Sequence, residues 1–251
     1  MAIKMIKNRV KLSIIVNIIF FGVFAIFVFH SKASPAFLNK VDDLAEATNI
    51  VSNGSRDRKV IALTFDDGPH PIYTNKILDI LKEYNVKATF FILGKHGELY
   101  PELLIRQNQE GHEIGIHSYN HINMKKEKKE VVEEEFNKTQ QIIFSKTGRK
   151  AQVFRPPYGT YNQTVYDIAV KNQCKIVLWT YYQDSKDWSN PGTDKIVETV
   201  ISQARNGDII LFHDHNEASE NQTIEALKEI IPDLINKGYK FVTISELLKQ
   251  E

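Results

Sequence analysis

The apolar and polar positions of this chain follow two alternating patterns. Short runs of consecutive apolar and β-branched residues, typical of strands buried on both faces, alternate with segments in which apolar residues recur every three or four positions, typical of helices. The first run is VIALTF at residues 60–65, and it leads into two adjacent carboxylates and a Gly-Pro turn. Further runs predict strands at residues 88–93, 112–117, 153–154, 175–180, 208–212 and 239–242.

Predicted helices separate these strands. Their ranges are about 77–84, 101–109, 125–146, 163–172, 194–204, 221–236 and 245–250. The charged residues within 125–135 predict a solvated helix face with i,i+4 ion pairs, to which we assign no function. Strands that are separated by helices pair in parallel through right-handed crossovers. The sequence therefore predicts an α/β fold with about seven parallel strands.

The N-terminus has a different pattern. No charged residue lies in residues 12–29, and this segment is dense in Ile, Val and Phe on every side. Its length is at the short end of a membrane span and also fits a signal-peptide core. The basic residues before it predict that residues 1–11 form a cytoplasmic tail and that the rest of the chain is exported. We therefore expect a single-pass cell-membrane anchor with the folded domain outside, or a secreted protein after signal cleavage.

The composition and charge of the chain limit its domain organisation and its possible partners. Residues 30–57 are mixed in character and are interpreted as a stem, which leaves residues 58–251 as one large domain. Five of the 32 Lys and Arg residues lie within residues 1–32, so 27 basic residues face 31 acidic ones in the remainder. This mildly acidic balance argues against nucleic acid as a partner, because nucleic-acid binding needs clustered basic residues. Cys174 is the single cysteine and cannot form an internal disulfide.

Candidate chemistry begins at the end of the first strand. Asp66 and Asp67 stand at the carboxyl edge of a parallel strand, where ligands bind, although Asp-Asp-Gly by itself is more often only a turn. The third strand leads into HSYNH, in which His117 and His121 would point the same way on a helical turn and could share a metal. Two His and one Asp on one rim suit Zn²⁺ or a similar divalent ion and leave positions open for water and substrate.

Three later strands also end in polar residues. RPPYG at 155–159 has two prolines that can aim Arg155 and a backbone N–H at a neighbouring site; the alternative is a stiff loop with a solvated arginine. DSKDW follows the fifth strand at residues 184–188, and the sixth strand ends in LFHD at residues 211–214. His213 is a core histidine or a member of the site, and the other polar strand ends favour the site.

Five segments in order, TFDDGP (64–69), HSYNH (117–121), RPPYG (155–159), DSKDW (184–188) and LFH (211–213), resemble the motifs of the polysaccharide deacetylases, the NodB homology domain of carbohydrate esterase family 4. The resemblance spans about residues 58–250. It implies a distorted (β/α) barrel and a metal-dependent hydrolase that removes acetyl groups from sugars. It implies one divalent metal ion, Zn²⁺ or alternatively Co²⁺ or another ion, and an N-acetylated polysaccharide substrate. We infer no protein partner.

The resemblance also implies roles for single residues. Asp67, His117 and His121 would hold the metal ion. Asp66 would be the general base and Arg155 would orient it. These roles agree with the chemistry of amide hydrolysis, in which a divalent ion lowers the pKa of water and a neighbouring carboxylate accepts its proton.

On the opposite side of the site, the resemblance implies that His213 is the general acid. An amine leaves poorly unless it is protonated, so His213 would need a carboxylate partner, either Asp187, which the resemblance implies, or Asp184. Trp188 and Leu211 would line the pocket for the acetyl methyl group. A backbone N–H near Tyr158 would stabilise the developing oxyanion.

We expect an N-deacetylase that acts on N-acetylglucosamine residues of a cell-envelope polysaccharide, with peptidoglycan as the first candidate. The alternatives are a deacetylase of chitin-type or other extracellular poly-N-acetylglucosamine and an esterase of O-acetylated polysaccharide. An alternative of another class is a metal-stabilised glycan-binding module without turnover. Asp66 and His213 argue against this last alternative, because binding alone needs neither a base nor an acid.

Overall fold

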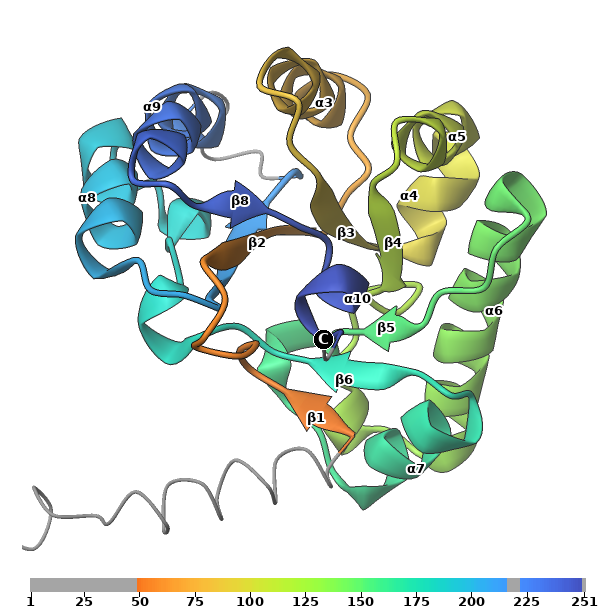
Figure 1. The fold of residues 1–251 in the computed structure, drawn as a ribbon. Coiled ribbons are helices and arrows are strands. Elements are labelled where there is room, and N and C mark those ends of the chain that lie inside the picture. Colours follow the sequence, from red (N-terminus) through yellow and green to blue (C-terminus); the bar gives the residue numbers. More distant parts are fainter. Residues whose placement is uncertain (1–48, 216–221, 250–251) are drawn as a thin grey trace, which may run out of the picture. The chain divides into compact units, whose positions relative to one another are not determined.

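The computed structural model describes residues 49–215 and 222–249 of the chain (Figure 1). The predicted cytoplasmic tail, the predicted anchor or signal segment and residues 30–48 of the predicted stem lie outside the described residues. Among the residues that the structure describes, no helix is long and apolar enough to cross a membrane.

The strands form one sheet in which every ladder is parallel. Its order is β1-β6-β5-β4-β3-β2-β7, and β8 pairs with the first residues of β2. The predicted α/β class and parallel sheet are confirmed. The strands are β1 (Ile50–Val51), β2 (Val60–Asp66), β3 (Ala88–Ile92), β4 (Glu113–Ile116), β5 (Val153–Phe154), β6 (Lys175–Val177), β7 (Ile209–His213) and β8 (Lys240–Phe241).

Strand β1 lies within the range that the sequence predicts to be a stem. Ile50 and Val51 pair with Ile176 and Val177 of β6. A run of two apolar residues is too short to give a strand pattern. The folded domain therefore includes residues 50 and 51, which precede the predicted start at residue 58.

Helices cover the outside of the sheet (Figure 1). Most of the predicted helices are confirmed to within a few residues, and α4 is additional. The helices are α3 (Tyr73–Glu83), α4 (Gly94–Leu99), α5 (Pro101–Gln109), α6 (Lys129–Thr147), α7 (Gln163–Lys171), α8 (Thr193–Gln203), α9 (Gln222–Asn236) and α10 (Ile244–Leu247). Single 3-10 turns occur at Met124–Lys126, Pro157–Gly159, Tyr181–Gln183 and Asp187–Ser189.

The sheet separates two apolar cores, because side chains along a strand alternate between its faces. In β2, Ile61, Leu63 and Phe65 belong to the outer core between sheet and helices. Val60 and Ala62 belong to a smaller inner core, which the curved sheet surrounds. The next inward positions of β2 are polar, so the inner core leads directly into the site.

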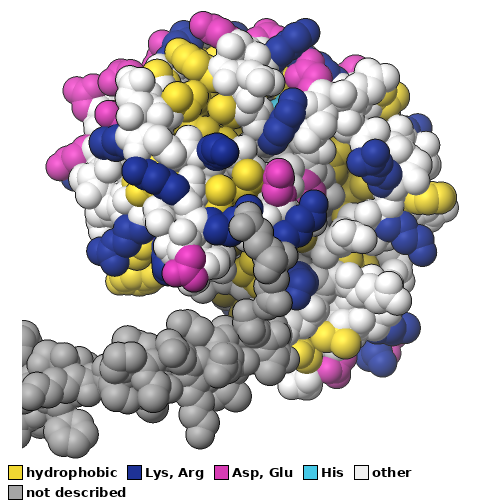
Figure 2. All heavy atoms as spheres, viewed as in Figure 1, with side chains coloured by type: hydrophobic (Ala, Val, Ile, Leu, Met, Phe, Trp, Pro, Cys, Tyr) yellow, Lys and Arg dark blue, Asp and Glu magenta, His cyan; other side chains and the backbone are white. Residues whose placement is uncertain are grey.

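Helix α10 closes the inner core at the amino-terminal end of the strands. Ile244 and Leu247 belong to the inner core, and the backbone N–H of Ile244 donates to Thr89 Oγ1 at the start of β3 (2.9 Å). Figure 1 shows α10 in the middle of the ring of strands, and the same face in Figure 2 carries Lys and Arg side chains interspersed with Asp and Glu. The carboxyl edge of the sheet, which bears the site, lies at the opposite end.

The sheet is an incomplete barrel. Its end strands are β1 and β7, and among the described residues two isolated bridges connect the neighbourhood of β1 and β6 to β7. One joins Asn53 to Asp208 and the other joins Asp184 to Leu211. The second bridge brings the segment after β6, which contains Asp187, to the end of β7, which contains His213.

Replacement of Phe65 by Ala tests the outer core. The buried ring of Phe65 stacks between Phe90 and Phe212, with centroid distances of 5.1 and 5.7 Å. We expect the free energy of unfolding to fall by about 3–5 kcal/mol, because the lost ring leaves a cavity. Chemical denaturation of the full-length protein measures this, with Phe144→Ala as the control. Phe144 is 50% exposed on α6, and its loss should cost about 1 kcal/mol or less; equal losses would contradict the assignment.

Candidate metal centre and catalytic site

The predicted site residues meet at the carboxyl edge of the sheet. Asp66 ends β2, His213 ends β7, and the two residues are partners in the register of these neighbouring strands. His117 directly follows β4, and Arg155 directly follows β5. Because all four strands run in parallel, their carboxyl ends deliver these side chains to one edge.

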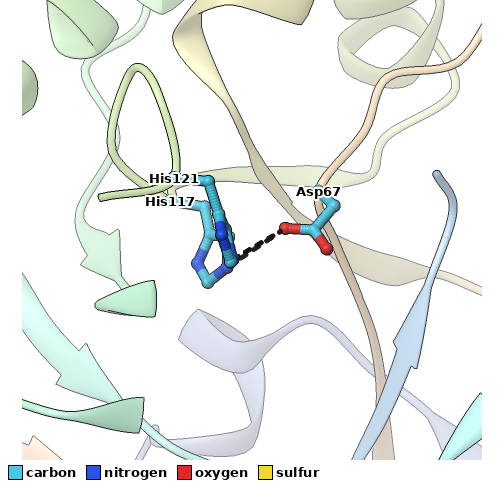
Figure 3. A group of neighbouring side chains, drawn as sticks. All are labelled: Asp67, His117 and His121. Carbon is cyan, nitrogen blue, oxygen red and sulfur yellow. Dashed lines mark ion pairs between the residues drawn. The ribbon is translucent and has the colours of Figure 1, made fainter. Parts of the chain in front are cut away.

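Asp67, His117 and His121 form a compact group whose side chains point toward one another (Figure 3). Asp67 Oδ1 lies 3.4 Å from His117 Nε2 and 3.3 Å from His121 Nε2. Tetrahedral zinc with bonds of about 2.0–2.1 Å would set its ligand atoms about 3.3–3.4 Å apart. The two distances from Asp67 Oδ1 therefore fit a small tetrahedral divalent ion.

The chemistry of the donor atoms supports this fit. Asp67 Oδ1 is buried and accepts no hydrogen bond. This oxygen atom, which faces the two imidazole rings, is therefore available to bind a cation. His117 Nδ1 lies 2.7 Å from the backbone oxygen of Arg155, which fixes the proton on Nδ1 and leaves the Nε2 lone pair toward Asp67. Burial lowers the pKa of His121 more than the Asp67 charge raises it, and this favours the neutral imidazole that metals bind.

The two histidines do not lie on a helical turn, so that expectation is wrong. Residues 117–121 form a loop in which Ser118 and His121 have left-handed backbones, with φ of 68° and 65°. The N–H of His121 donates to Ser118 Oγ (2.9 Å). The curvature of this loop, rather than helical periodicity, brings the two rings to within 5.3 Å between centroids.

Arg155 is fully buried, so the alternative of a solvated arginine is wrong. Its Nη1 donates to Asp66 Oδ1 (2.7 Å) and to Thr64 Oγ1 (2.9 Å). Nε and Nη2 donate to the backbone oxygens of Val177 and Leu178, each at 3.0 Å. Burial lowers the pKa of Arg155 and the charge of Asp66 opposes this shift.

The two adjacent carboxylates face different partners. Asp66 is an extended strand residue, and Arg155 occupies its Oδ1 while its Oδ2 lies 3.7 Å from His117 Nε2. Asp67 is left-handed (φ 74°), which turns its side chain away from the direction of the strand. Consecutive residues can therefore serve separate functions, one in the metal group and one beside it.

His213 pairs with Asp187 and not with Asp184. Asp187 Oδ1 lies 2.7 Å from His213 Nδ1, and Oδ2 accepts the backbone N–H of His213 (2.8 Å). Asp184 Oδ1 instead accepts the N–H of Lys186 (3.0 Å). Burial lowers the pKa of His213, but the charge and hydrogen bond of Asp187 outweigh it and raise the pKa to about 9. Since Asp187 holds Nδ1, Nε2 is the atom that remains for proton transfer.

The three predicted substrate-binding residues lie beside the metal group or beside the pair of His213 and Asp187. Tyr158 is left-handed (φ 62°), and its exposed ring meets the ring of His121 edge-on at 4.8 Å. Trp188 is 55% exposed, and its backbone N–H donates to Asp187 Oδ1 (2.9 Å). Leu211 is buried two residues before His213, on the same face of β7.

Several residues of the site have no signal in the sequence. Thr223 of α9 donates to Asp187 Oδ2 (2.8 Å), and His96 of α4 bonds the backbone oxygen of Asp67 through Nδ1 (2.7 Å). Buried Asp214 accepts from Thr74 Oγ1 (2.6 Å) and fills the space above Gly68, behind Asp67. These residues contact the site from distant segments, and none of them lies within the five motifs; Asp214 directly follows the LFH segment.

The chain matches the family model described as polysaccharide deacetylase over residues 53–177. It is 42% identical over 193 residues to a peptidoglycan-N-acetylglucosamine deacetylase of Bacillus cereus, an alignment that covers 77% of this chain and 90% of the relative. It is 41% identical over 191 residues to the peptidoglycan-N-acetylmuramic acid deacetylase PdaC of Bacillus subtilis, covering 76% of this chain and 39% of that longer protein.

A solved structure shows the same fold. The crystal structure of the Bc1960 peptidoglycan N-acetylglucosamine deacetylase, in complex with 4-naphthalen-1-yl-N-oxidanyl-benzamide, superposes with a TM-score of 0.79. The two sequences are 35% identical in this superposition, which covers 82% of this chain and 96% of that one.

Replacement of Asp187 by Asn tests the His213 pair. The variant removes the Asp187 charge, which contributes most to raising the pKa of His213, and leaves the burial that lowers it, so the pKa should fall well below about 9. NMR titration of the imidazole signals of the metal-free, full-length protein measures this. Asp184→Asn is the matched control and should leave the pKa unchanged. A fall in the control and not in Asp187→Asn would reverse the assignment.

Proposed function

The chain belongs to the polysaccharide deacetylase family, and we propose that it removes N-acetyl groups from N-acetylglucosamine residues of peptidoglycan. The observation that carries this proposal is the arrangement of three groups at one edge: a metal triad, a carboxylate held by a buried arginine, and a histidine paired with a buried carboxylate. The relatives that act on peptidoglycan by name favour this polymer as the substrate.

Asp67, His117 and His121 would hold the metal ion. We propose Zn²⁺, because nitrogen and oxygen ligands at this spacing suit it, with Co²⁺ as the alternative. When bound, the ion would act as a Lewis acid, which would lower the pKa of a water molecule and polarise the acetyl carbonyl. The remaining steps are proton transfers and charge stabilisation by residues of this chain.

Asp66 is the proposed general base. Its Oδ2 lies beside the triad, 3.7 Å from His117 Nε2, where it can accept the proton of the attacking water. Arg155 donates to Oδ1 at 2.7 Å and so fixes the orientation of the carboxylate. The backbone N–H of Tyr158 is the proposed donor to the developing oxyanion.

His213 is the proposed general acid. With Nδ1 held by Asp187, His213 carries a proton on Nε2 at neutral pH, and it can transfer this proton to the nitrogen of the leaving glucosamine. Protonation changes the nitrogen into a good leaving group, so the C–N bond breaks and acetate is released. Trp188 and Leu211 are proposed to line the pocket for the acetyl methyl group.

We also propose that residues 12–29 place the domain outside the cell, as a membrane anchor or as a signal sequence. The support is the uncharged apolar segment behind a basic N-terminus. Cell fractionation and sequencing of the mature N-terminus would separate an anchored protein from a secreted one. Recovery from the cytoplasm with an intact N-terminus would contradict both.

Replacement of Asp66 by Asn tests the proposed reaction. The full-length protein, loaded with Zn²⁺ or Co²⁺ after chelation, should release acetate from peptidoglycan, and Asp66→Asn should lower kcat by about 10²–10⁴-fold because the base is lost. Asp167→Asn, on the exposed face of α7, is the matched control and should retain full activity. Undiminished acetate release by Asp66→Asn would exclude Asp66 as the base.

Parallel substrates identify the polymer. Mass spectrometry of digested peptidoglycan shows whether glucosamine or muramic acid carries the free amine. Release from chitin oligomers but not from peptidoglycan would favour the chitin-type alternative, and release from acetylated xylan alone would favour an esterase. Binding of metal and glycan without release of acetate from any of them would favour the non-catalytic binding module.

The pH dependence of kcat tests the acid. His213 must be protonated to act, so activity should fall as pH rises through its pKa. Asp187→Asn lowers this pKa, and the alkaline limb of the profile should therefore move to lower pH. The Asp184→Asn control should keep the wild-type limb. An alkaline limb that does not move in Asp187→Asn would show that another group supplies the proton.

A further inference from the structure

The loop that carries the two histidines of the metal triad has an unfavourable backbone. Ser118 and His121 are both left-handed, a conformation that residues other than glycine seldom adopt. Such a conformation persists only where surrounding contacts determine it. The contacts that hold residues 117–121, the ligand loop, are therefore part of the metal centre.

Helix α4 holds the ligand loop by donating backbone hydrogen bonds to carbonyl groups of the loop. The N–H of Gly94 donates to the backbone oxygen of Ser118 (3.0 Å), and the N–H of Lys95 donates to that of Tyr119 (3.2 Å). The Tyr119 ring lies against Gly94, where a Cβ would approach it to 2.5 Å. These contacts involve the carbonyl groups of the ligand loop, so its N–H groups need hydrogen-bond acceptors from another part of the fold.

Glu135 of helix α6 supplies the acceptors. Its Oε2 accepts the N–H groups of Tyr119 (2.8 Å) and Asn120 (2.7 Å), and its Oε1 accepts from Asn120 Nδ2 (2.7 Å). One carboxylate therefore receives three hydrogen bonds from the two residues between Ser118 and His121. Glu135 is only 7% exposed, so the carboxylate that accepts these bonds is largely shielded from water.

The sequence around Glu135 does not indicate that this residue is buried. It lies in the charged run 125–135, which predicts a solvated helix face, and for Glu135 that prediction is wrong. The buried side of α6 consists of Val132, Glu135, Phe136, Thr139 and Ile143. Glu134, the preceding residue, is exposed as predicted.

We infer that Glu135 is a positioning residue for the metal centre, which holds the ligand loop in the conformation that directs His117 and His121 at Asp67. This inference rests on the metal site of the proposed function. Loss of the carboxylate would remove the acceptor of the Tyr119 and Asn120 N–H groups and would release the segment that sets the position of His121. Residues that orient metal ligands in this way affect metal affinity as well as activity.

Metal affinity, measured by competition with a chelator on the full-length protein, tests the inference directly. Glu135→Ala should weaken Zn²⁺ binding by about 10–100-fold. Glu135→Gln should stay within a few fold of wild type, because its Oε1 can accept both N–H groups while its amide donates to a flipped Asn120 side chain. Glu134→Ala removes a carboxylate one residue away and should bind Zn²⁺ as wild type does.

A second readout separates positioning from a merely structural contribution. A structural contribution predicts that Glu135→Ala lowers the melting temperature equally with and without Zn²⁺ and leaves affinity unchanged, which would overturn the inference. Positioning predicts that added Zn²⁺ raises the melting temperature of Glu135→Ala less than that of wild type. The visible spectrum of bound Co²⁺ should also change in Glu135→Ala and not in Glu134→Ala.

If Glu135→Ala does not fold, Glu135→Asp replaces it. Aspartate keeps the charge but is one methylene shorter, so it cannot reach all three donors, and its Zn²⁺ affinity should fall. Wild-type affinity in Glu135→Asp would overturn the inference. A wild-type protein that binds no metal would instead refute the proposed function together with this inference, and the two failures are therefore distinguishable.

Discussion

The buried pair of Arg155 and Asp66 is the constraint on which the rest of the site depends. A guanidinium removed from water is tolerated only when its donors are satisfied, and here they bind Thr64, Asp66 and two backbone oxygens at the end of β6. The same contacts join β2, β5 and β6 at the top of the inner core. The pair thus links the packing of the sheet to the orientation of the carboxylate that we propose as the general base.

Different surroundings give different properties to groups of the same chemical type. Asp66 and Asp67 are adjacent, but one meets an arginine and the other meets two imidazoles. His121 has its pKa lowered by burial, whereas Asp187 raises the pKa of His213 to about 9. An imidazole that binds a metal ion must be neutral and a general acid must be protonated, and these two environments favour the states that the proposed function requires.

The helices that surround the sheet also contribute to the site. Thr223 of α9 holds Asp187, His96 of α4 holds the backbone of Asp67, and Glu135 of α6 holds the ligand loop. Each contact joins segments that are distant in the sequence. The positions of the site residues therefore depend on the helices outside the sheet as well as on the ends of the strands.

The sequence by itself determined the order of strands and helices, the parallel sheet and the residues at its carboxyl edge, because buried strands and polar strand ends are local patterns. It did not predict β1, whose two apolar residues gain a strand conformation only by pairing with β6. The choice between Asp187 and Asp184, the burial of Arg155 and of Glu135, and the left-handed ligand loop were decided by tertiary structure. A side chain's charge is encoded locally, but its burial and its partner depend on segments that only folding brings together.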